Sequence, residues 1–413
     1  MSSAERQGAF IIVGGGIAGL ASALALAPHA SSVTVLERNS RFQEVGAGIQ
    51  LSPNAFAALD ELGVKEAVLT RSIRVQRLTV LDAQSGGTLV DFPLDDRFEA
   101  QFGHPYAVVH RGALHRTLLD ACRRLATIRL ITNANVNGLT EHDDSITANL
   151  ADGRVFVGDV LIGADGLNSS VRAQVVGDGA PEPAGHVVYR AVISAEQFPA
   201  DLPARSSILW AGPDMHVVHY PLADGKSFNL VATRVEPVNE MFANRGIQAA
   251  WVRSAFASVA PPLRRLLDAP AHWRAWSIAD RAPVHTWHRG RAVLMGDAAH
   301  PMLQYAAQGA CQAIEDAVIF ARLVGAVGAN DAVASLGPAR AGRTARVQQT
   351  ARWLGDAIYH PAGVPRRARD VMLKSLDHAK LTASLQWLYA WTPDNGLALA
   401  NTHATHDGEL IRP

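Results

Sequence analysis

The chain has 413 residues, of which 48% are hydrophobic and 18% are charged, a composition typical of a globular protein with a large core. Basic and acidic residues both number 38, so the formal net charge is zero and no electrostatic attraction to nucleic acid or to an anionic membrane is expected. The two cysteines, Cys122 and Cys311, form neither a CxxC pair nor a zinc-ligand spacing. We expect reduced thiols in a cytoplasmic protein.

The first element lies in the uncharged stretch from Ala9 to Ala27, "AFIIVGGGIAGLASALALA". A membrane-spanning helix needs about 20 apolar residues, but three consecutive glycines oppose one, since each costs about 1 kcal/mol in a helix interior. The preceding "MSSAERQG" is a poor basic region for a signal peptide. We therefore expect neither a membrane span nor a signal peptide.

The same stretch fits a strand, a turn and a helix. "AFIIV" is a short apolar strand, "GGGIAG" contains the GxGxxG spacing of Gly14, Gly16 and Gly19, and a second strand, "VTVLE", ends at Glu37. Gly14 would make the tight turn, Gly16 would admit backbone N–H groups to a pyrophosphate, and Gly19 would let the helix pack on the strand. Glu37 would accept hydrogen bonds from a ribose. This predicts a dinucleotide site at a helix N-terminus, without separating NAD from FAD.

Two later segments bear on the identity of the dinucleotide. Residues 159–172, "DVLIGADGLNSSVR", which we call the DG segment, form an apolar strand that ends at Asp165, although alone they also fit an ordinary strand and turn. In residues 291–324, which we call the GD segment, a strand ends at Asp297, and an apolar helix begins near Gly309. Asp297 is placed to accept from a ribityl or ribose hydroxyl, and the helix would direct its positive end at an electron-rich ring.

These segments, in this order, resemble the single-component, FAD-dependent aromatic hydroxylases of the group A flavoprotein monooxygenases over about residues 9–325. In "VVHRGALHRTLL", Arg111 matches the family's arginine near the FAD, and the resemblance also places Arg38 and Gly48 beside the cofactor. One departure is Ala307, which stands where many relatives have the first glycine of a Gly-x-Gly loop. It leaves the geometry of that loop open.

The resemblance implies an α/β fold: a Rossmann-like FAD-binding domain, an inserted, mainly β substrate domain and a C-terminal helical region. "HVVYRAVI", "SSILWA", "MHVVHYPL" and "SFNLVATRV" fit the strands of the inserted sheet. The expected bounds are 1–72, 105–180 and 285–350 for the FAD domain, 73–104 and 181–284 for the substrate domain, and 351–413 for the C-terminal region and tail.

The C-terminal region is expected to be mainly helical to about residue 392. Trp387 and Trp391 in "QWLYAW" suggest packing or a dimer contact, and a homodimer is a further expectation. The last segment, from Pro393, is polar and expected to be frayed. His403 and His406 are too isolated to predict a metal site, and no metal is expected.

The strand "MHVVHYPL" carries the candidate catalytic side chains. Alternation puts His216 and Tyr220 on one face and His219 on the other. A lone strand histidine is more often a core or surface residue, but the resemblance implies that a His and a Tyr four residues apart line the active site of hydroxylases acting on small phenolic acids. Together with Gln304, which follows Pro301, and the later segment "YHPAGVPRRARDVML", the pair is most similar to 3-hydroxybenzoate 6-hydroxylases, and salicylate hydroxylases are the second alternative.

The family chemistry implied is reduction of FAD by NADH or NADPH, followed by reaction with O2 to an electrophilic C4a-hydroperoxide. No second GxGxxG with its strand and helix is present, which matches a transiently bound nicotinamide. Ionising a phenol at pH 7 costs about 4 kcal/mol. His216 is the candidate base, and Tyr220 and Gln304 would hydrogen-bond the substrate.

The expected reaction turns 3-hydroxybenzoate into 2,5-dihydroxybenzoate, with the partner of the substrate carboxylate unassigned. A decarboxylating salicylate hydroxylation, another flavin-dependent oxidoreductase and a non-catalytic flavin-binding protein are the alternatives.

Overall fold

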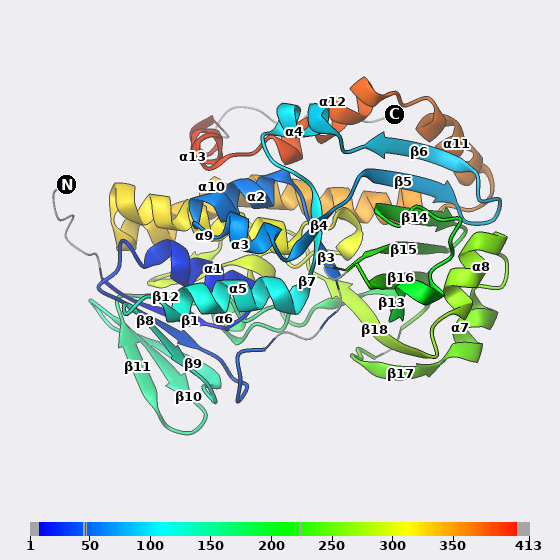
Figure 1. Ribbon diagram of the computed structural model, residues 1–413. Helices are drawn as coiled ribbons and strands as arrows, with labels where there is room; N and C mark the ends of the chain where they lie inside the picture. Colours follow the sequence, from blue (N-terminus) through cyan, green and yellow to red (C-terminus); the bar gives the residue numbers. More distant parts are fainter. Residues whose placement is uncertain (1–7, 44–45, 47, 223–224, 239, 403–413) are drawn as a thin grey trace.

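The computed structural model describes residues 8–43, 46, 48–222, 225–238 and 240–402. Figure 1 shows two lobes side by side, one built on a parallel sheet and the other on a mostly antiparallel sheet, with the C-terminal helices lying across both. The mixed α/β fold class predicted from the sequence is confirmed.

The parallel sheet forms the first lobe. Its central strand is the apolar "AFIIV", which is buried because helices cover the sheet. Helix α1 (Ile17–Leu26) follows the glycine turn, α5 (Arg111–Arg123) begins at Arg111, and α9 (Gly309–Val327) follows the loop after Asp297. Helix α1 packs against both of the others. In sheet order the strands are β19 (His288–Arg289), β20 (Ala292–Leu294), β12 (Val160–Gly163), β1 (Ala9–Val13), β2 (Ser32–Leu36) and β8 (Ile128–Ile131), all parallel except β19 against β20.

Two small antiparallel sheets flank this lobe. Each has three strands, and the second brings residues near 50 and near 110 together. The first is β11 (Val155–Gly158), β10 (Ile146–Leu150) and β9 (Val136–Glu141), and the second is β3 (Gly48–Leu51), β7 (Ala107–His110) and β4 (Ser72–Arg74).

The second lobe is an eight-stranded sheet. One of its faces packs against α7 (Ala249–Ala255) and α8 (Pro261–Asp268) and forms a second hydrophobic core, which contains Trp210 and Val217. In sheet order the strands are β17 (Arg245–Gln248), β18 (His272–Asp280), β13 (Glu182–Ser194), β16 (Ser227–Val235), β15 (Met215–Pro221), β14 (Ser206–Gly212), β5 (Arg77–Asp82) and β6 (Thr88–Pro93), and only the β14–β5 pair is parallel.

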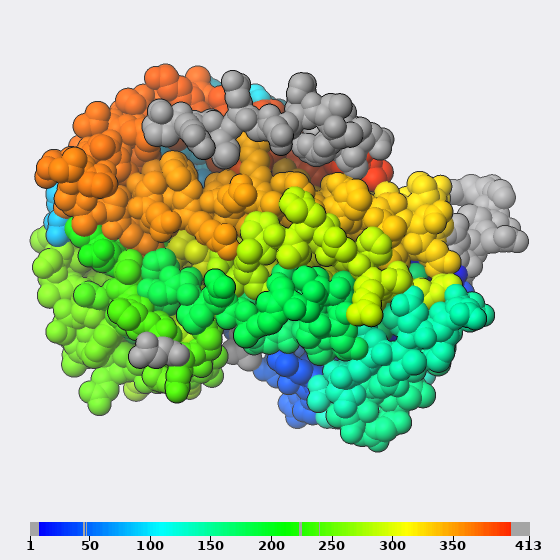
Figure 2. All heavy atoms as spheres, turned by 180° about the vertical axis from the view of Figure 1, so that it is seen from behind, coloured from blue at the N-terminus to red at the C-terminus, as the bar shows by residue number. Residues whose placement is uncertain are grey.

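The helices connect and cover both lobes, and α10 is the longest, at 25 residues. Seen from behind in Figure 2, the C-terminal residues in orange cover the top of the molecule above the green and the teal parts. The α-helices are α1 (Ile17–Leu26), α2 (Pro53–Glu61), α3 (Lys65–Leu69), α4 (Asp96–Phe102), α5 (Arg111–Arg123), α6 (Ser170–Val175), α7 (Ala249–Ala255), α8 (Pro261–Asp268), α9 (Gly309–Val327), α10 (Ala329–Trp353), α11 (Gly363–Lys374), α12 (His378–Tyr389) and α13 (Pro393–Thr402). The 3-10 turns η1 (Ala195–Gln197), η2 (Gly296–Ala298) and η3 (Gln304–Ala306) and the π-helix η4 (Leu354–Tyr359) complete the elements.

Helix α13 differs from the frayed end expected after residue 392. It forms over Pro393–Thr402 because Gly396 lets it approach Trp391: a Cβ on Gly396 would lie 2.6 Å from the indole Nε1. Trp391 is buried in the main core, and Arg346 stacks on Trp387 at 4.0 Å. These contacts support the packing alternative for both tryptophans. Residues 403–413, with the two late histidines, lie outside the described residues.

Within the described part of the chain, no helix is both long and apolar enough to cross a membrane. The uncharged stretch that begins at Ala9 instead divides into β1, the glycine turn and α1, as the sequence predicted. Both cysteines are buried free thiols, and burial raises the pKa of Cys122 to about 12.

Candidate active site

A cavity of about 1360 Å³ lies where the two lobes meet. Every candidate residue except Gly19 lines it, although these residues come from seven separate segments of the chain. The lining candidates are Gly14, Gly16, Glu37, Arg38, Gly48, Arg111, Asp165, His216, Tyr220, Asp297, Gln304 and Gly309.

The glycine turn at one end has no room for side chains. Gly14 has φ +110°, and a Cβ there would lie 2.3 Å from the carbonyl oxygen of Ala164. A Cβ on Gly19 would lie 1.9 Å from the carbonyl oxygen of Gly14. Gly19 therefore acts from behind the cavity wall, by letting α1 approach the turn, which is the packing role expected of it. Gly16 begins α1 without a side-chain cap, so backbone N–H groups there are available to an anion.

Glu37 bridges the end of β2 and the glycine turn. Its Oε2 accepts a hydrogen bond from the backbone N–H of Gly15 at 2.9 Å, and its Oε1 accepts from the backbone and the side-chain amide of Asn39. The glycine turn makes a second hydrogen bond with the fully buried His115 of α5, whose Nε2 lies 2.8 Å from the carbonyl oxygen of Gly15. No sequence pattern singled out His115, because its role depends on a contact with a residue 100 positions away.

In the GD segment, the carboxylate of Asp297 is exposed although the residues around it, just after strand β20, are buried. The buried neighbours are Gly296 and Ala298. A Cβ on Gly309 would lie 3.7 Å from Asp297 Oδ1, so this carboxylate sits at the start of α9. Asp297 and Gly309 therefore face the same part of the cavity, and their contacts with a cofactor stay predictions.

A buried ionic network centred on Asp316 of α9 fixes the backbone of the GD segment. Asp316 accepts from the backbone N–H of Gly296 at 3.0 Å, from Arg340 Nε at 2.7 Å, and contacts His300 Nε2 at 2.5 Å. Burial alone would raise the pKa of Asp316, but His300 and Arg340 hold it down at about 2. The carboxylate thus stays charged and fixes the turn that carries Asp297.

The DG segment is tied to the GD segment. The carboxylate of Asp165 accepts from the backbone N–H of Ser170 at 2.7 Å and from the Ser169 hydroxyl, at the start of α6. The fully buried Arg172 of α6 donates to the carbonyl oxygens of Ala298 and Ala299. Asp165 therefore orders its own turn, and a direct contact with the cofactor remains a prediction.

Ala307 keeps the backbone conformation that glycine would favour. It has φ +53° and ψ +32°, in the left-handed region, where a Cβ costs about 1–2 kcal/mol. Ala307 therefore adopts a conformation that is easier for glycine, the residue that many relatives have at this position.

The other end of the cavity is formed by β15. Its pairing with both neighbouring strands is regular, so His216, Val218 and Tyr220 all face the cavity, as alternation predicts. His219 points into the second core beside Trp210 and Phe198. Burial lowers the pKa of His219 to about 3.

His216 is paired with a histidine from the C-terminal region. His216 Nδ1 and His360 Nε2 are 2.7 Å apart, and the two rings stack. Burial and the neighbours His360 and His186 lower the pKa of His216 well below its ordinary value. Burial and His186 lower the pKa of His360 to about 3. The pair is thus neutral at pH 7 in the free protein.

Gln304 is held between two strands of the eight-stranded sheet. Its Oε1 accepts from Arg190 Nη2 at 2.9 Å, and its Nε2 donates to Thr233 Oγ1 at 3.3 Å. Neither Arg190 nor His360 was singled out from the sequence. A charge inside the apolar run "HVVYRAVI" was a usable signal for Arg190, whereas His360 comes near His216 only through the fold.

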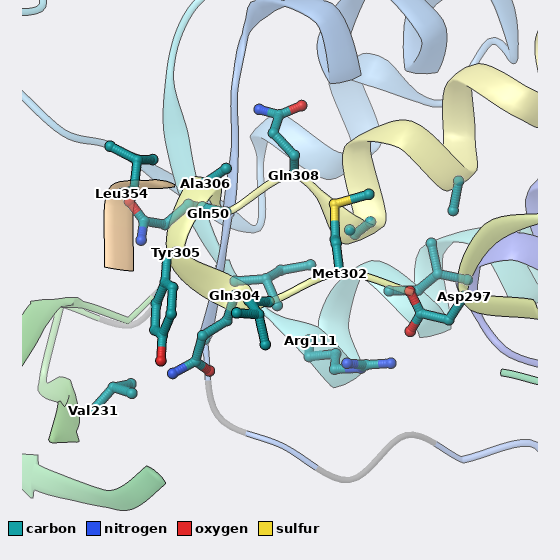
Figure 3. A pocket seen from close by; sticks show the side chains of 18 of the residues that line it. Gln50, Arg111, Val231, Asp297, Met302, Gln304, Tyr305, Ala306, Gln308 and Leu354 are labelled. Carbon is teal, nitrogen blue, oxygen red and sulfur yellow. The ribbon is translucent and has the colours of Figure 1, made fainter. Parts of the chain in front are cut away.

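Figure 3 shows how the two ends of the cavity relate. Asp297 and Arg111 lie on one side, and Gln304, Tyr305 and Val231 lie on the other, joined by the loop that carries Met302. The loop thus connects the predicted cofactor end to the predicted substrate end. Among the described residues, no three His, Cys, Asp or Glu side chains come together as a metal site.

Comparison with known proteins identifies the family. A family described as "FAD binding domain" matches residues 8–353. A protein of Klebsiella oxytoca named 3-hydroxybenzoate 6-hydroxylase is 42% identical over 389 residues, which cover 94% of this chain and 98% of that protein. The chain belongs to the FAD-dependent aromatic hydroxylases. A second relative of this hydroxylase family, from Polaromonas naphthalenivorans and with the same name, is 39% identical over 94% of this chain and 97% of its own length.

The fold of this FAD-dependent aromatic monooxygenase is also found in a solved structure, described as a salicylate hydroxylase substrate complex. It has a TM-score of 0.81 and 26% sequence identity, and the match covers 96% of this chain and 98% of the other. The cofactor end of the cavity fits FAD, because the crowded glycine turn would exclude a Cβ while the uncapped start of α1 faces the same space.

Proposed function

We propose that this hydroxylase uses NADH or NADPH and O2 to convert 3-hydroxybenzoate into 2,5-dihydroxybenzoate. The observation that carries the proposal is the pairing of His216 with His360 on the cavity wall, beside Tyr220 and Gln304. The names of the relatives at 42% and 39% identity support the substrate. The cytoplasmic location and the homodimer stay predictions.

FAD, when bound, would supply the redox chemistry that activates O2 at the expense of the nicotinamide. Gly14, Gly16, Glu37, Arg38, Arg111, Asp165, Asp297 and Gly309 are the residues proposed to hold it. What remains for the protein is to position the phenol and to remove its proton.

His360 sets the protonation of His216. A neutral imidazole has one N–H and one acceptor nitrogen. If His216 Nδ1 donates to His360 Nε2, the Nε2 of His216 is left as an acceptor toward the cavity, which is the form a general base needs. A phenol that donates to this nitrogen selects that tautomer, in the way that a carboxylate orients the histidine of a catalytic triad.

Because its pKa is low, His216 is unprotonated at pH 7 and can accept the phenol proton. For the same reason, its imidazolium form is unstable unless an anion lies beside it. The phenol proton is therefore held only while the phenolate stays beside it, as an ion pair in a site of low dielectric. Tyr220 keeps its own proton, since burial raises its pKa, and so it can act as a hydrogen-bond donor to the substrate.

A panel of four ligands tests the proposal: 3-hydroxybenzoate, salicylate, 4-hydroxybenzoate and benzoate, each with the FAD-loaded enzyme, NADH and air. We expect 2,5-dihydroxybenzoate from the first, and NADH use without hydroxylation from benzoate, which has no phenol to ionise. Catechol from salicylate with 3-hydroxybenzoate inert would move the assignment to the second alternative. Stoichiometric hydroxylation of benzoate would contradict the need for a base.

A further inference from the structure

We infer that Arg190 binds the carboxylate of the substrate. The inference deepens the proposed function and rests on it, because it takes the substrate to be an aromatic acid. Arg190 lies on β13 and lines the same cavity as His216 and Tyr220.

Arg190 lacks a balancing anion in the described part of the chain. Its guanidinium donates through Nη2 to the neutral amide of Gln304 and lies 5.5 Å from the ring centre of Trp276, while its Nε is buried without a partner. No described Asp or Glu lies within ion-pair distance of it. Arg190 is partly buried, and burial together with the nearby cation Arg111 lowers its pKa. A cation in this setting is costly unless an anion joins it.

The strand register places Arg190 close enough to contact the aromatic substrate whose phenol His216 would deprotonate. Arg190, Val231 and Val218 are register partners on three neighbouring strands. His216 and Tyr220 stand two residues before and after Val218, about 7 Å away along the strand, and adjacent strands are about 4.8 Å apart. The two valines thus form an apolar floor, with His216 and Arg190 on different sides of it.

A 3-hydroxybenzoate ring on this floor has its two polar groups in the meta relation. With the phenol at His216, the carboxylate faces the side where Arg190 and Tyr220 stand, and both of these side chains line the same cavity. Gln304 contacts Arg190 and reaches Thr233, the register partner of His216, so it spans the two ends of the ring. Arg190 and Tyr220 would donate to the carboxylate together.

The test compares a charged ligand with its neutral isostere. Binding of 3-hydroxybenzoate and of 3-hydroxybenzamide to the oxidised, FAD-loaded enzyme is measured from the change in flavin absorbance, in wild type, Arg190→Gln and Arg190→Lys. We expect wild type to prefer the carboxylate by about 100-fold, since truncating one partner of a buried charge pair has large effects. Arg190→Gln should lose this preference almost completely, and Arg190→Lys should keep part of it.

Two control variants isolate the charge. Arg274→Gln removes an exposed arginine from the neighbouring strand β18, and its preference should equal that of wild type. Gln304→Leu removes the neutral partner of Arg190 and should weaken both ligands equally. If Gln304→Leu abolished the preference for the carboxylate while Arg190→Gln kept it, Gln304 would be the partner of the carboxylate, and the inference would be overturned.

The outcomes separate this inference from the proposed function. A wild-type enzyme that binds the acid and the amide equally would overturn the inference, whereas failure to form 2,5-dihydroxybenzoate from 3-hydroxybenzoate would refute the proposed function. If wild type prefers the acid over the amide and Arg190→Gln keeps this preference, Arg190 does not bind the carboxylate. The proposed function would be unaffected by that result. A variant that keeps the preference but has a lowered flavin reduction potential would reassign Arg190 to the reduced cofactor, and would overturn the inference as well.

Discussion

At the scale of single residues, the site depends on pairs of side chains from distant parts of the chain. His216 alone, buried and of low pKa, resembles a core histidine such as His219. What distinguishes the two is that His216 has one nitrogen bound to His360 and faces the cavity, whereas neither ring nitrogen of His219 has a hydrogen-bond partner in the described structure. The role proposed for His216 therefore rests on its hydrogen-bond partner and its place in the cavity, and not on its pKa.

The pairing predicts a graded response to changes at His360. His360→Leu removes the acceptor of the His216 Nδ1 proton, and we expect hydroxylation to slow by about 100-fold, within the range typical of a lost general base. His360→Gln retains an amide oxygen as acceptor and should recover most of this loss. The measurement is product formed per NADH consumed in each variant.

A purely structural role for His360 predicts a different pattern. Both variants would then lose thermal stability, and their product yield per NADH would stay equal to that of wild type. Equal yields in His360→Leu and His360→Gln would therefore remove the tautomer argument.

At the scale of elements, the cavity is shaped by close approaches between strands and turns. Gly48 of β3 faces Tyr220 of β15, and a Cβ on Gly48 would lie 2.3 Å from the tyrosine ring. We expect Gly48→Ala to displace Tyr220 and to weaken binding of the aromatic acid at least tenfold while FAD stays bound, because a contact this short requires the ring to move. Titration of flavin absorbance with the acid gives both quantities.

Gly246→Ala on β17 is the matched control, since a Cβ at Gly246 has no heavy atom within 4 Å. It should bind the acid like wild type. Loss of FAD from Gly48→Ala, with binding of the acid unchanged in the reconstituted enzyme, would show that Gly48 serves the cofactor, as the sequence resemblance suggested.

The loop after η3 stores strain at Ala307. Ala307→Gly relieves a left-handed alanine, which costs about 1–2 kcal/mol, against about 0.4–1 kcal/mol of added freedom in the unfolded chain. We expect a net gain of about 0.5–1 kcal/mol in the free energy of unfolding, measured by urea denaturation. Ala306→Gly, at the end of the 3-10 turn η3, is the control and should lose stability. An Ala307→Gly protein less stable than wild type would mean that the methyl group has packing value in the loop.

At the scale of the whole molecule, the fold was largely predictable because local patterns carry it. The glycine turn, the apolar strands and the alternation in β15 each depend on neighbours within a few residues, and each appeared as expected. The domain bounds stay predictions. The contacts of His115, His360 and Arg190 were not predicted, because each joins segments about 100 residues apart or more. Helix α13 was not predicted, because its packing on Trp391 cannot be read from a mostly polar sequence.

The buried histidines predict how stability responds to acid. A histidine whose pKa is lowered in the folded state contributes its full stability above the unfolded value of about 6.5, and this contribution is lost as the pH falls toward the folded value. For His219, with a pKa of about 3, the loss approaches about 1.4 kcal/mol per pH unit below 6.5. The free energy of unfolding should therefore fall between pH 7.5 and pH 5.

His219→Leu removes this titration while it fills most of the same space. Between pH 7.5 and pH 5, the free energy of unfolding should fall in both proteins, but the fall should be about 1–2 kcal/mol smaller in His219→Leu than in wild type. Urea denaturation at the two pH values measures both falls. His272→Leu is the control, because the exposed imidazole of His272 is solvated before and after unfolding. Parallel losses in His219→Leu and wild type would show that water or movement relieves the burial of His219.

The central claim is that His216 removes the proton of a phenolic acid on a flavin-loaded enzyme. The direct measurement is the amount of 2,5-dihydroxybenzoate formed from 3-hydroxybenzoate by His216→Ala and by wild type, both with full FAD content, across pH 6.5–9. The account predicts hydroxylation slower by about 10²–10⁴-fold in the variant, with partial recovery at high pH, where the free phenol ionises, and with NADH use continuing. Equal rates of 2,5-dihydroxybenzoate formation in the two proteins at pH 7 would contradict it.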